Sequence, residues 1–84
     1  MHDLHEANKI IKLVLEKAKE NNFKKVGKIV IELGQIIEHG QTITPENLRF
    51  NLEMLSEETI AKNANIVIND SKNDYWKLVE IEGD

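Results

Sequence analysis

The sequence predicts an α+β fold with two layers, in which two helices pack on one face of a small mixed sheet of three or four strands. Three observations support this prediction: a helical apolar period over residues 4–20, a strand-like alternation over 26–33, and turn residues that divide the rest into one helix and two strands. The predicted order is helix, strand, helix, strand, strand. With 84 residues, the chain is expected to form a single domain over residues 1–84.

Residues 4–20 carry the clearest helical pattern. Apolar side chains recur at steps of three and four and form one stripe, made of Leu4, Ala7, Ile11, Val14 and Ala18 and widened by Ile10 and Leu15. Asp3 is a suitable N-cap, and Glu6 three residues later completes a pair of the capping-box kind. Asn21 and Asn22 favour the end of this helix.

Residues 26–33 alternate as expected for a strand with one buried face. The apolar face consists of Ile29, Ile31 and Leu33. The opposite face is mixed and carries Lys28, Val30 and Glu32. Gly34 marks the end of this strand or a bend.

The segment 35–44 combines two tendencies. Ile36 and Ile37 could extend the sheet, whereas residues 38–42 have the composition of a loop or hairpin tip. Thr44 followed by Pro45 is a strong helix start, with a hydroxyl cap and proline at the first position. This second helix is predicted to end near residues 56–58, with an apolar face made of Leu48, Leu52 and Leu55.

Two strands are predicted in the last third of the chain. The first covers residues 66–68 and ends at Asn69-Asp70, and residues 71–74 have turn composition. The second, over residues 75–81, returns along the sheet. Simple alternation places Trp76, Leu78 and Glu80 on one face of this strand, and the other face then carries Tyr75, Lys77, Val79 and Ile81.

Composition excludes several classes of function. A net charge of −4 and an aromatic share of 5% argue against a nucleic-acid binder. No apolar run approaches the roughly 20 residues of a membrane span, and no signal-peptide pattern opens the chain, so a soluble cytoplasmic protein is expected. The core of such a small domain is expected to be of modest stability, which is compatible with self-association as a homodimer.

The sequence also argues against an enzyme. It contains no cysteine, which removes thiolate chemistry, disulfides and Cys-type zinc sites. Its serines are Ser56 and Ser71, and neither stands in a recognisable His-acid setting. Neither a glycine-rich phosphate loop nor an HExxH pattern is present.

The first six residues place two imidazoles and two carboxylates close to the chain terminus. Methionine followed by the bulky His2 is expected to escape initiator-methionine trimming, so the α-amine of Met1 should be retained. This amine, the backbone nitrogen of His2 and its imidazole can close fused chelate rings around one cation. Flat, nitrogen-rich donor sets of this kind suit Ni(II) and Cu(II). The alternatives are a terminal imidazole without a role and, for Asp3, a helix N-cap alone.

Several segments carry a family resemblance. They are Met1-His2-Asp3-Leu4, the strand Ile29-Val30-Ile31-Glu32-Leu33-Gly34, Thr44-Pro45-Glu46-Asn47-Leu48-Arg49-Phe50, and Thr59-Ile60-Ala61 followed by Ala64-Asn65-Ile66-Val67-Ile68. In these segments, which span roughly residues 1–70, the chain resembles the HypA/HybF family of nickel-insertion accessory proteins. That family serves the maturation of nickel-iron hydrogenase and urease.

The resemblance implies a nickel-binding domain whose site consists of Met1, His2 and Asp3. His2 would be the imidazole ligand, with the terminal amine and the backbone at residues 2 and 3 as further donors. The implied role is that of a metallochaperone that delivers Ni(II) as transient cargo. Its implied partners are a GTP-hydrolysing nickel-insertion protein and the hydrogenase or urease precursor. Because these donors bind Cu(II) more tightly than Ni(II), the choice of nickel follows from the resemblance and not from the ligands.

Three features depart from the family pattern. The zinc module with two CxxC pairs, expected after residues 66–68, is absent, so no zinc is predicted. Residue 3 is Asp where the family usually has Glu, and the segment 35–43 is longer than usual and carries His39. His5 and His39 could each add a nitrogen donor, although exposed side chains are the simpler interpretation. The alternative function is a metal-independent interaction or dimerisation module, which loss of the zinc module favours.

Overall fold

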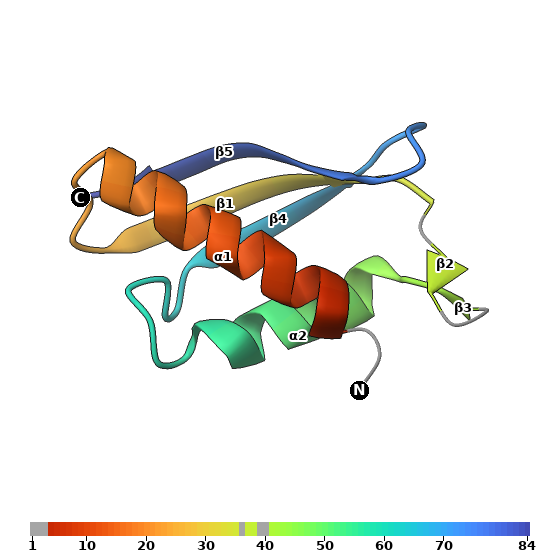
Figure 1. The fold of residues 1–84 in the computed structure, drawn as a ribbon, viewed down its shortest axis with the longest axis horizontal. Coiled ribbons are helices and arrows are strands. Elements are labelled where there is room, and N and C mark those ends of the chain that lie inside the picture. Colours follow the sequence, from red (N-terminus) through yellow and green to blue (C-terminus); the bar gives the residue numbers. More distant parts are fainter. Residues whose placement is uncertain (1–3, 36, 39–40) are drawn as a thin grey trace.

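The computed structural model describes residues 4–35, 37–38 and 41–84. Within these residues, two helices and five strands follow one another (Figure 1). Their bounds are α1 Leu4–Glu20, β1 Val26–Leu33, β2 Ile37–Glu38, β3 Gln41–Thr42, α2 Pro45–Ser56, β4 Asn65–Asp70 and β5 Trp76–Gly83. The helices at 4–20 and from Pro45, the strand at 26–33 and the two later strands are therefore confirmed.

The main sheet has three strands in the order β4-β1-β5. β1 pairs in parallel with β4 and antiparallel with β5, so the sheet is mixed. Both helices lie on one side of this sheet, and the predicted two-layer α+β fold is confirmed (Figure 1). Residues 37–38 do not extend it; in the described part of the chain they pair with residues 41–42 as a separate hairpin.

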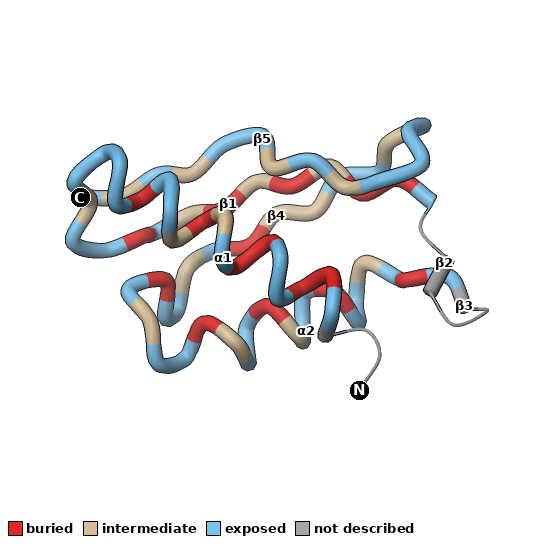
Figure 2. The backbone as a smooth tube through the Cα atoms, viewed as in Figure 1, coloured by how far each residue is buried: buried red, intermediate tan, exposed pale blue. Residues whose placement is uncertain are grey.

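The core lies between the two helices and the sheet (Figure 2). β1 directs Ile29, Ile31 and Leu33 towards the helices, as its alternation predicts. The helices supply the facing apolar side chains, which are Ala7, Ile10, Ile11, Val14 and Ala18 from α1 and Leu48 and Leu52 from α2. Because these side chains form one cluster with the sheet, the described chain has a single hydrophobic core.

The start of α2 is capped as the sequence predicts. The Thr44 side chain accepts a hydrogen bond from the backbone nitrogen of Asn47 at 3.2 Å, and Pro45 occupies the first position of the helix. A cap of this kind satisfies one of the backbone N–H groups that have no intrahelical acceptor. It fixes where the chain turns from the β2–β3 hairpin into the helix.

The predicted facing of β5 is wrong beyond Leu78. Val30 pairs with Glu80 and Ile31 with Leu78, so Val79 is an extra residue between two ladder positions. Such a bulge shifts the alternation by one residue. Consequently Ile81 joins Trp76 and Leu78 against the core, and Glu80 is exposed together with Val79. The bulge thus keeps the Glu80 carboxylate out of the core.

The turn between β4 and β5 closes directly against the end of β1. The backbone nitrogen of Gly34 donates to the carbonyl of Tyr75 at 2.9 Å, and that of Gln35 donates to the carbonyl of Asn73 at 3.1 Å. A Cβ atom at position 34 would collide with the Asn73 carbonyl group and would lie 2.7 Å from the Tyr75 oxygen. Gly34 therefore permits a backbone approach that a larger residue would prevent.

Candidate functional site

The predicted metal site lies just before the described chain begins. Met1, His2 and Asp3 are outside the described residues, and α1 starts at Leu4. His39 is likewise outside them, so its suggested role as a further donor stays a prediction. His5 is described and is exposed on the first turn of α1. Among the described residues, no three His, Cys, Asp or Glu side chains are placed to hold a metal ion.

The first turn of α1 contains a buried carboxylate. Glu6 is only 8% exposed, and its Oε1 accepts hydrogen bonds from the Tyr75 hydroxyl and the Trp76 indole nitrogen, each at 2.8 Å. Its Oε2 lies 3.6 Å from the ammonium nitrogen of Lys9. Both oxygens therefore have partners, as burial of a charged group requires.

These contacts lower the pKa of Glu6. Burial alone would raise it, but the hydrogen bonds from Trp76 and Tyr75 and the charges of Lys9 and His5 together outweigh that effect, so the pKa lies below its usual value of 4.5. On the other side of the network, the hydrogen bond with Tyr75 and the charge of Glu6 raise the pKa of Lys9. The carboxylate is therefore ionised throughout the neutral range.

Replacement of Glu6 by glutamine is expected to change how stability depends on pH. A carboxyl group whose pKa is lowered by folding stabilises the folded state above its unfolded pKa, and this contribution is lost as the pH falls through the folded pKa. The difference in unfolding free energy between the parent and Glu6→Gln should thus be constant near neutrality and shrink as the pH falls below the usual glutamate pKa of 4.5. Urea denaturation at a series of pH values will measure it. A difference that widens with acidity would contradict the assignment.

Sequence reasoning missed this cluster. The sequence predicts a capping-box pair of Glu6 with Asp3, which lies outside the described residues, so that pairing stays a prediction. The described contacts of Glu6 are with Tyr75, Trp76 and Lys9. Alternation places the two aromatic residues on opposite faces of one strand and pairs neither of them with Glu6. One local signal existed: Glu6 lies one helical turn before Ile10, at the edge of the apolar stripe, where a charged side chain needs partners. The two aromatic partners are 69 and 70 positions away, and a period within one helix cannot identify them.

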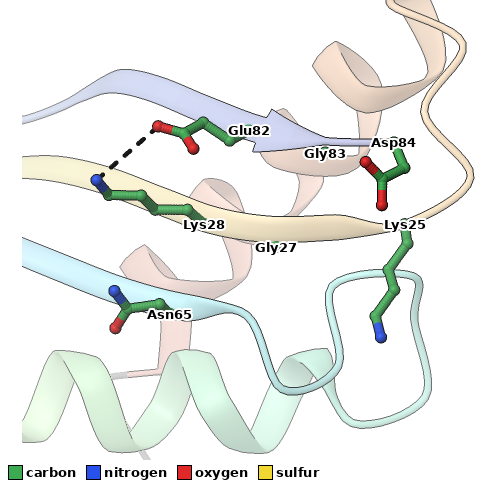
Figure 3. A pocket seen from close by; sticks show the side chains of 7 residues that line it. All are labelled: Lys25, Gly27, Lys28, Asn65, Glu82, Gly83 and Asp84. Atoms are coloured by element: carbon green, nitrogen blue, oxygen red, sulfur yellow. Dashed lines mark ion pairs between the residues drawn. The ribbon is translucent and has the colours of Figure 1, made fainter.

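A surface hollow lies far from this cluster, where β5 ends (Figure 3). It is lined by Lys25, Gly27, Lys28, Asn65, Glu82, Gly83 and Asp84. Lys28 lies across from Glu82, with 3.8 Å between the ammonium nitrogen and Oε2. Because amines and carboxylates of opposite charge are interspersed, the hollow has no single sign of charge with which to select a ligand. It contains none of the predicted site residues.

Neither helix in the described part of the chain combines the length and the apolar content needed to cross a membrane. α1, the longer one, has 17 residues and carries charged side chains along its outer face. Its apolar stripe is already buried against the sheet.

The sequence matches one protein family along most of its length. The family model described as "Hydrogenase/urease nickel incorporation, metallochaperone, hypA" matches residues 1–76. The match begins with the predicted donors Met1, His2 and Asp3 and ends at Trp76, so it includes both halves of the Glu6 cluster.

Curated relatives give the same result. The chain is 37% identical over 68 residues to a hydrogenase maturation factor HypA from Methanocella arvoryzae, covering 81% of this chain and 57% of the relative. It is 41% identical over 68 residues to the factor of the same name from Methanobrevibacter smithii, covering 81% of this chain and 51% of the relative. The chain therefore spans about half the length of the curated relatives it matches.

The fold is also found in a solved structure. The solution structure of the Ni metallochaperone HypA from Helicobacter pylori superposes with a TM-score of 0.80 at 19% sequence identity, covering 99% of this chain and 97% of that one. At this identity the likeness supports the fold. The family match over residues 1–76 leads to one conclusion: the chain belongs to the HypA family.

Proposed function

We propose that this protein is a nickel-binding accessory protein that delivers Ni(II) during maturation of nickel-iron hydrogenase or urease. The family match carries the proposal, because it extends over residues 1–76 and includes the terminal donors. Residues 1–84 would form one nickel-binding domain without a zinc module, in keeping with a sequence that contains no cysteine. The domain binds and transfers the metal and has no catalytic role of its own.

The metal donors in this proposal are the α-amine of Met1, the imidazole of His2 and backbone groups at His2 and Asp3. An α-amine has a pKa of about 8 and an imidazole one of about 6.5, so both lose protons at small cost near neutral pH. Ionisation of a backbone amide is much less favourable and requires the bound cation. Affinity should therefore increase steeply with pH.

Transfer requires a site that another protein can reach. Donors at the start of the chain, ahead of the exposed His5, meet this requirement better than a closed cage of side chains. The partners we propose are a GTP-hydrolysing nickel-insertion protein and the precursor of the nickel enzyme, and the proposed compartment is the cytoplasm. Nickel is transient cargo in this scheme.

Ni(II) titration of the chain with its native N-terminus tests the proposal. Replacement of His2 by alanine removes the imidazole donor, and acetylation of the α-amine removes another. Each change removes a direct metal ligand. Ni(II) binding should therefore weaken by more than the roughly 10- to 100-fold that follows loss of a group hydrogen-bonded to a ligand. Isothermal titration calorimetry of the parent, His2→Ala and the acetylated chain will measure this.

His5→Ala is the matched control, since it removes a neighbouring exposed imidazole. It should bind Ni(II) as tightly as the parent. Equal binding by the parent and His2→Ala would contradict the proposed site, and no Ni(II) binding by either would favour the metal-independent interaction module instead.

A further inference from the structure

The Glu6 carboxylate connects the first turn of α1 with the start of β5. Its donors, Tyr75 and Trp76, are 69 and 70 positions away in the sequence. Both donate to the same oxygen, whereas the ammonium group of Lys9 lies beside the other. Hydrogen bonds to an ionised acceptor are stronger than those between neutral groups. This is therefore a firm point of attachment between α1 and the start of β5.

Glu6 lies near the start of its helix, so the attachment stabilises the first turn of α1. Glu6 is the third residue of α1, in the turn from which the chain continues to the proposed nickel donors. The first turn of a helix has N–H groups without intrahelical acceptors and is where unwinding begins. A side chain that ties this turn to another element opposes the unwinding.

The other side of the attachment is bonded to the central strand of the sheet. Trp76 pairs with Leu33 in the sheet, and the carbonyl of Tyr75 accepts a hydrogen bond from Gly34. The two aromatic rings lie against each other with centroids 5.4 Å apart. The donors to Glu6 are thus held by the central strand and by each other.

We propose that Glu6 is a positioning residue for the nickel site. By fixing the first turn of α1 to Tyr75 and Trp76, it gives the proposed donors Met1, His2 and Asp3 a fixed point of attachment to the fold. Less conformational freedom is then lost when these donors close around the cation, so the affinity is higher. This inference rests on the proposed function, and it assigns to Glu6 a role in metal binding without contact with the metal.

Ni(II) titration of Glu6 variants with a native N-terminus tests the inference. Glu6→Ala should raise the Kd for Ni(II) by about threefold to tenfold, less than the roughly 10- to 100-fold typical of a group bonded directly to a ligand. Glu6→Gln keeps an oxygen acceptor and should recover part of the affinity. Tyr75→Phe removes one donor and should also weaken binding. Amide hydrogen exchange in the first turn of α1 should be faster in Glu6→Ala.

Two controls separate positioning from a general loss of stability. Glu16→Ala removes an exposed carboxylate from the same helix and should bind Ni(II) as the parent does. Ile66→Val lowers stability by removing a buried methyl group from β4, far from α1's first turn in sequence, and should also leave the Kd unchanged.

The outcomes distinguish the two proposals. If the parent binds Ni(II) and Glu6→Ala binds it equally well, the positioning role is overturned and the proposed function stands. If Ile66→Val weakens binding as much as Glu6→Ala does, the effect belongs to overall stability and the positioning role is again overturned. If the parent does not bind Ni(II), the proposed function fails and this inference fails with it.

Discussion

Replacement of Gly34 by alanine should lower the free energy of unfolding by roughly 3 kcal/mol. The added Cβ would collide with the backbone of Asn73 and lie 2.7 Å from the Tyr75 oxygen. Backbone atoms in a paired turn cannot move aside as the end of a flexible side chain can. The turn would have to separate from β1, with loss of the hydrogen bond from Gly34 to Tyr75.

Gly27→Ala is the matched control because it adds the same methyl group near the other end of β1, whereas Gly34 directly follows the strand. There the nearest atom to the added Cβ is the Glu82 oxygen at 4.0 Å, an ordinary contact. Gly27→Ala should change stability by no more than about 0.5 kcal/mol. Urea denaturation followed by circular dichroism will compare the two variants. Similar stabilities would show that the turn can lie further from β1.

Replacement of Ile31 by alanine is expected to have an effect of similar or larger size. Ile31 is fully buried in the central strand, where Ile68 and Leu78 flank it in the sheet. Removing a large apolar side chain from such a site destabilises proteins by about 2 to 5 kcal/mol, because a cavity is left behind. For an 84-residue domain this is a large part of a total of roughly 5 to 15 kcal/mol.

The neighbouring residue provides the control for Ile31. Val30 points to the opposite face of β1 and is only partly buried. Val30→Ala should therefore destabilise the protein by about 1 kcal/mol, well below the effect of Ile31→Ala. Thermal unfolding of both variants will measure the difference. Equal destabilisation would mean that the two faces of the sheet are buried to the same extent.

The sequence predicts those parts of the fold that depend on local patterns. The apolar stripe locates α1, the alternation locates β1, and Thr44-Pro45 locates the start of α2. The facing of β5 could not be obtained in the same way. The bulge at Val79 exists because of the register with β1, and register between distant strands is not encoded in either strand alone.

The candidate site likewise has one part that the sequence predicts and another that only the fold reveals. Adjacent donors at the chain start can be proposed from their spacing and from the family resemblance, since a chelate formed by neighbouring residues is local chemistry. The contacts of Glu6 with Tyr75 and Trp76 required the fold. A buried carboxylate indicates that partners exist, but only the topology of the sheet brings the start of β5 to the first turn of α1.

The strand order β4-β1-β5 also has a consequence for synthesis on the ribosome. β1 is translated first of the three, yet its antiparallel neighbour is translated last. Until residues 76–83 have emerged, one side of β1 lacks its backbone partner, and an open edge of this kind can pair with another polypeptide. The interval between the synthesis of β1 and that of β5 is therefore the one in which this edge of the nascent chain is open to other polypeptides, and chaperone protection would matter there.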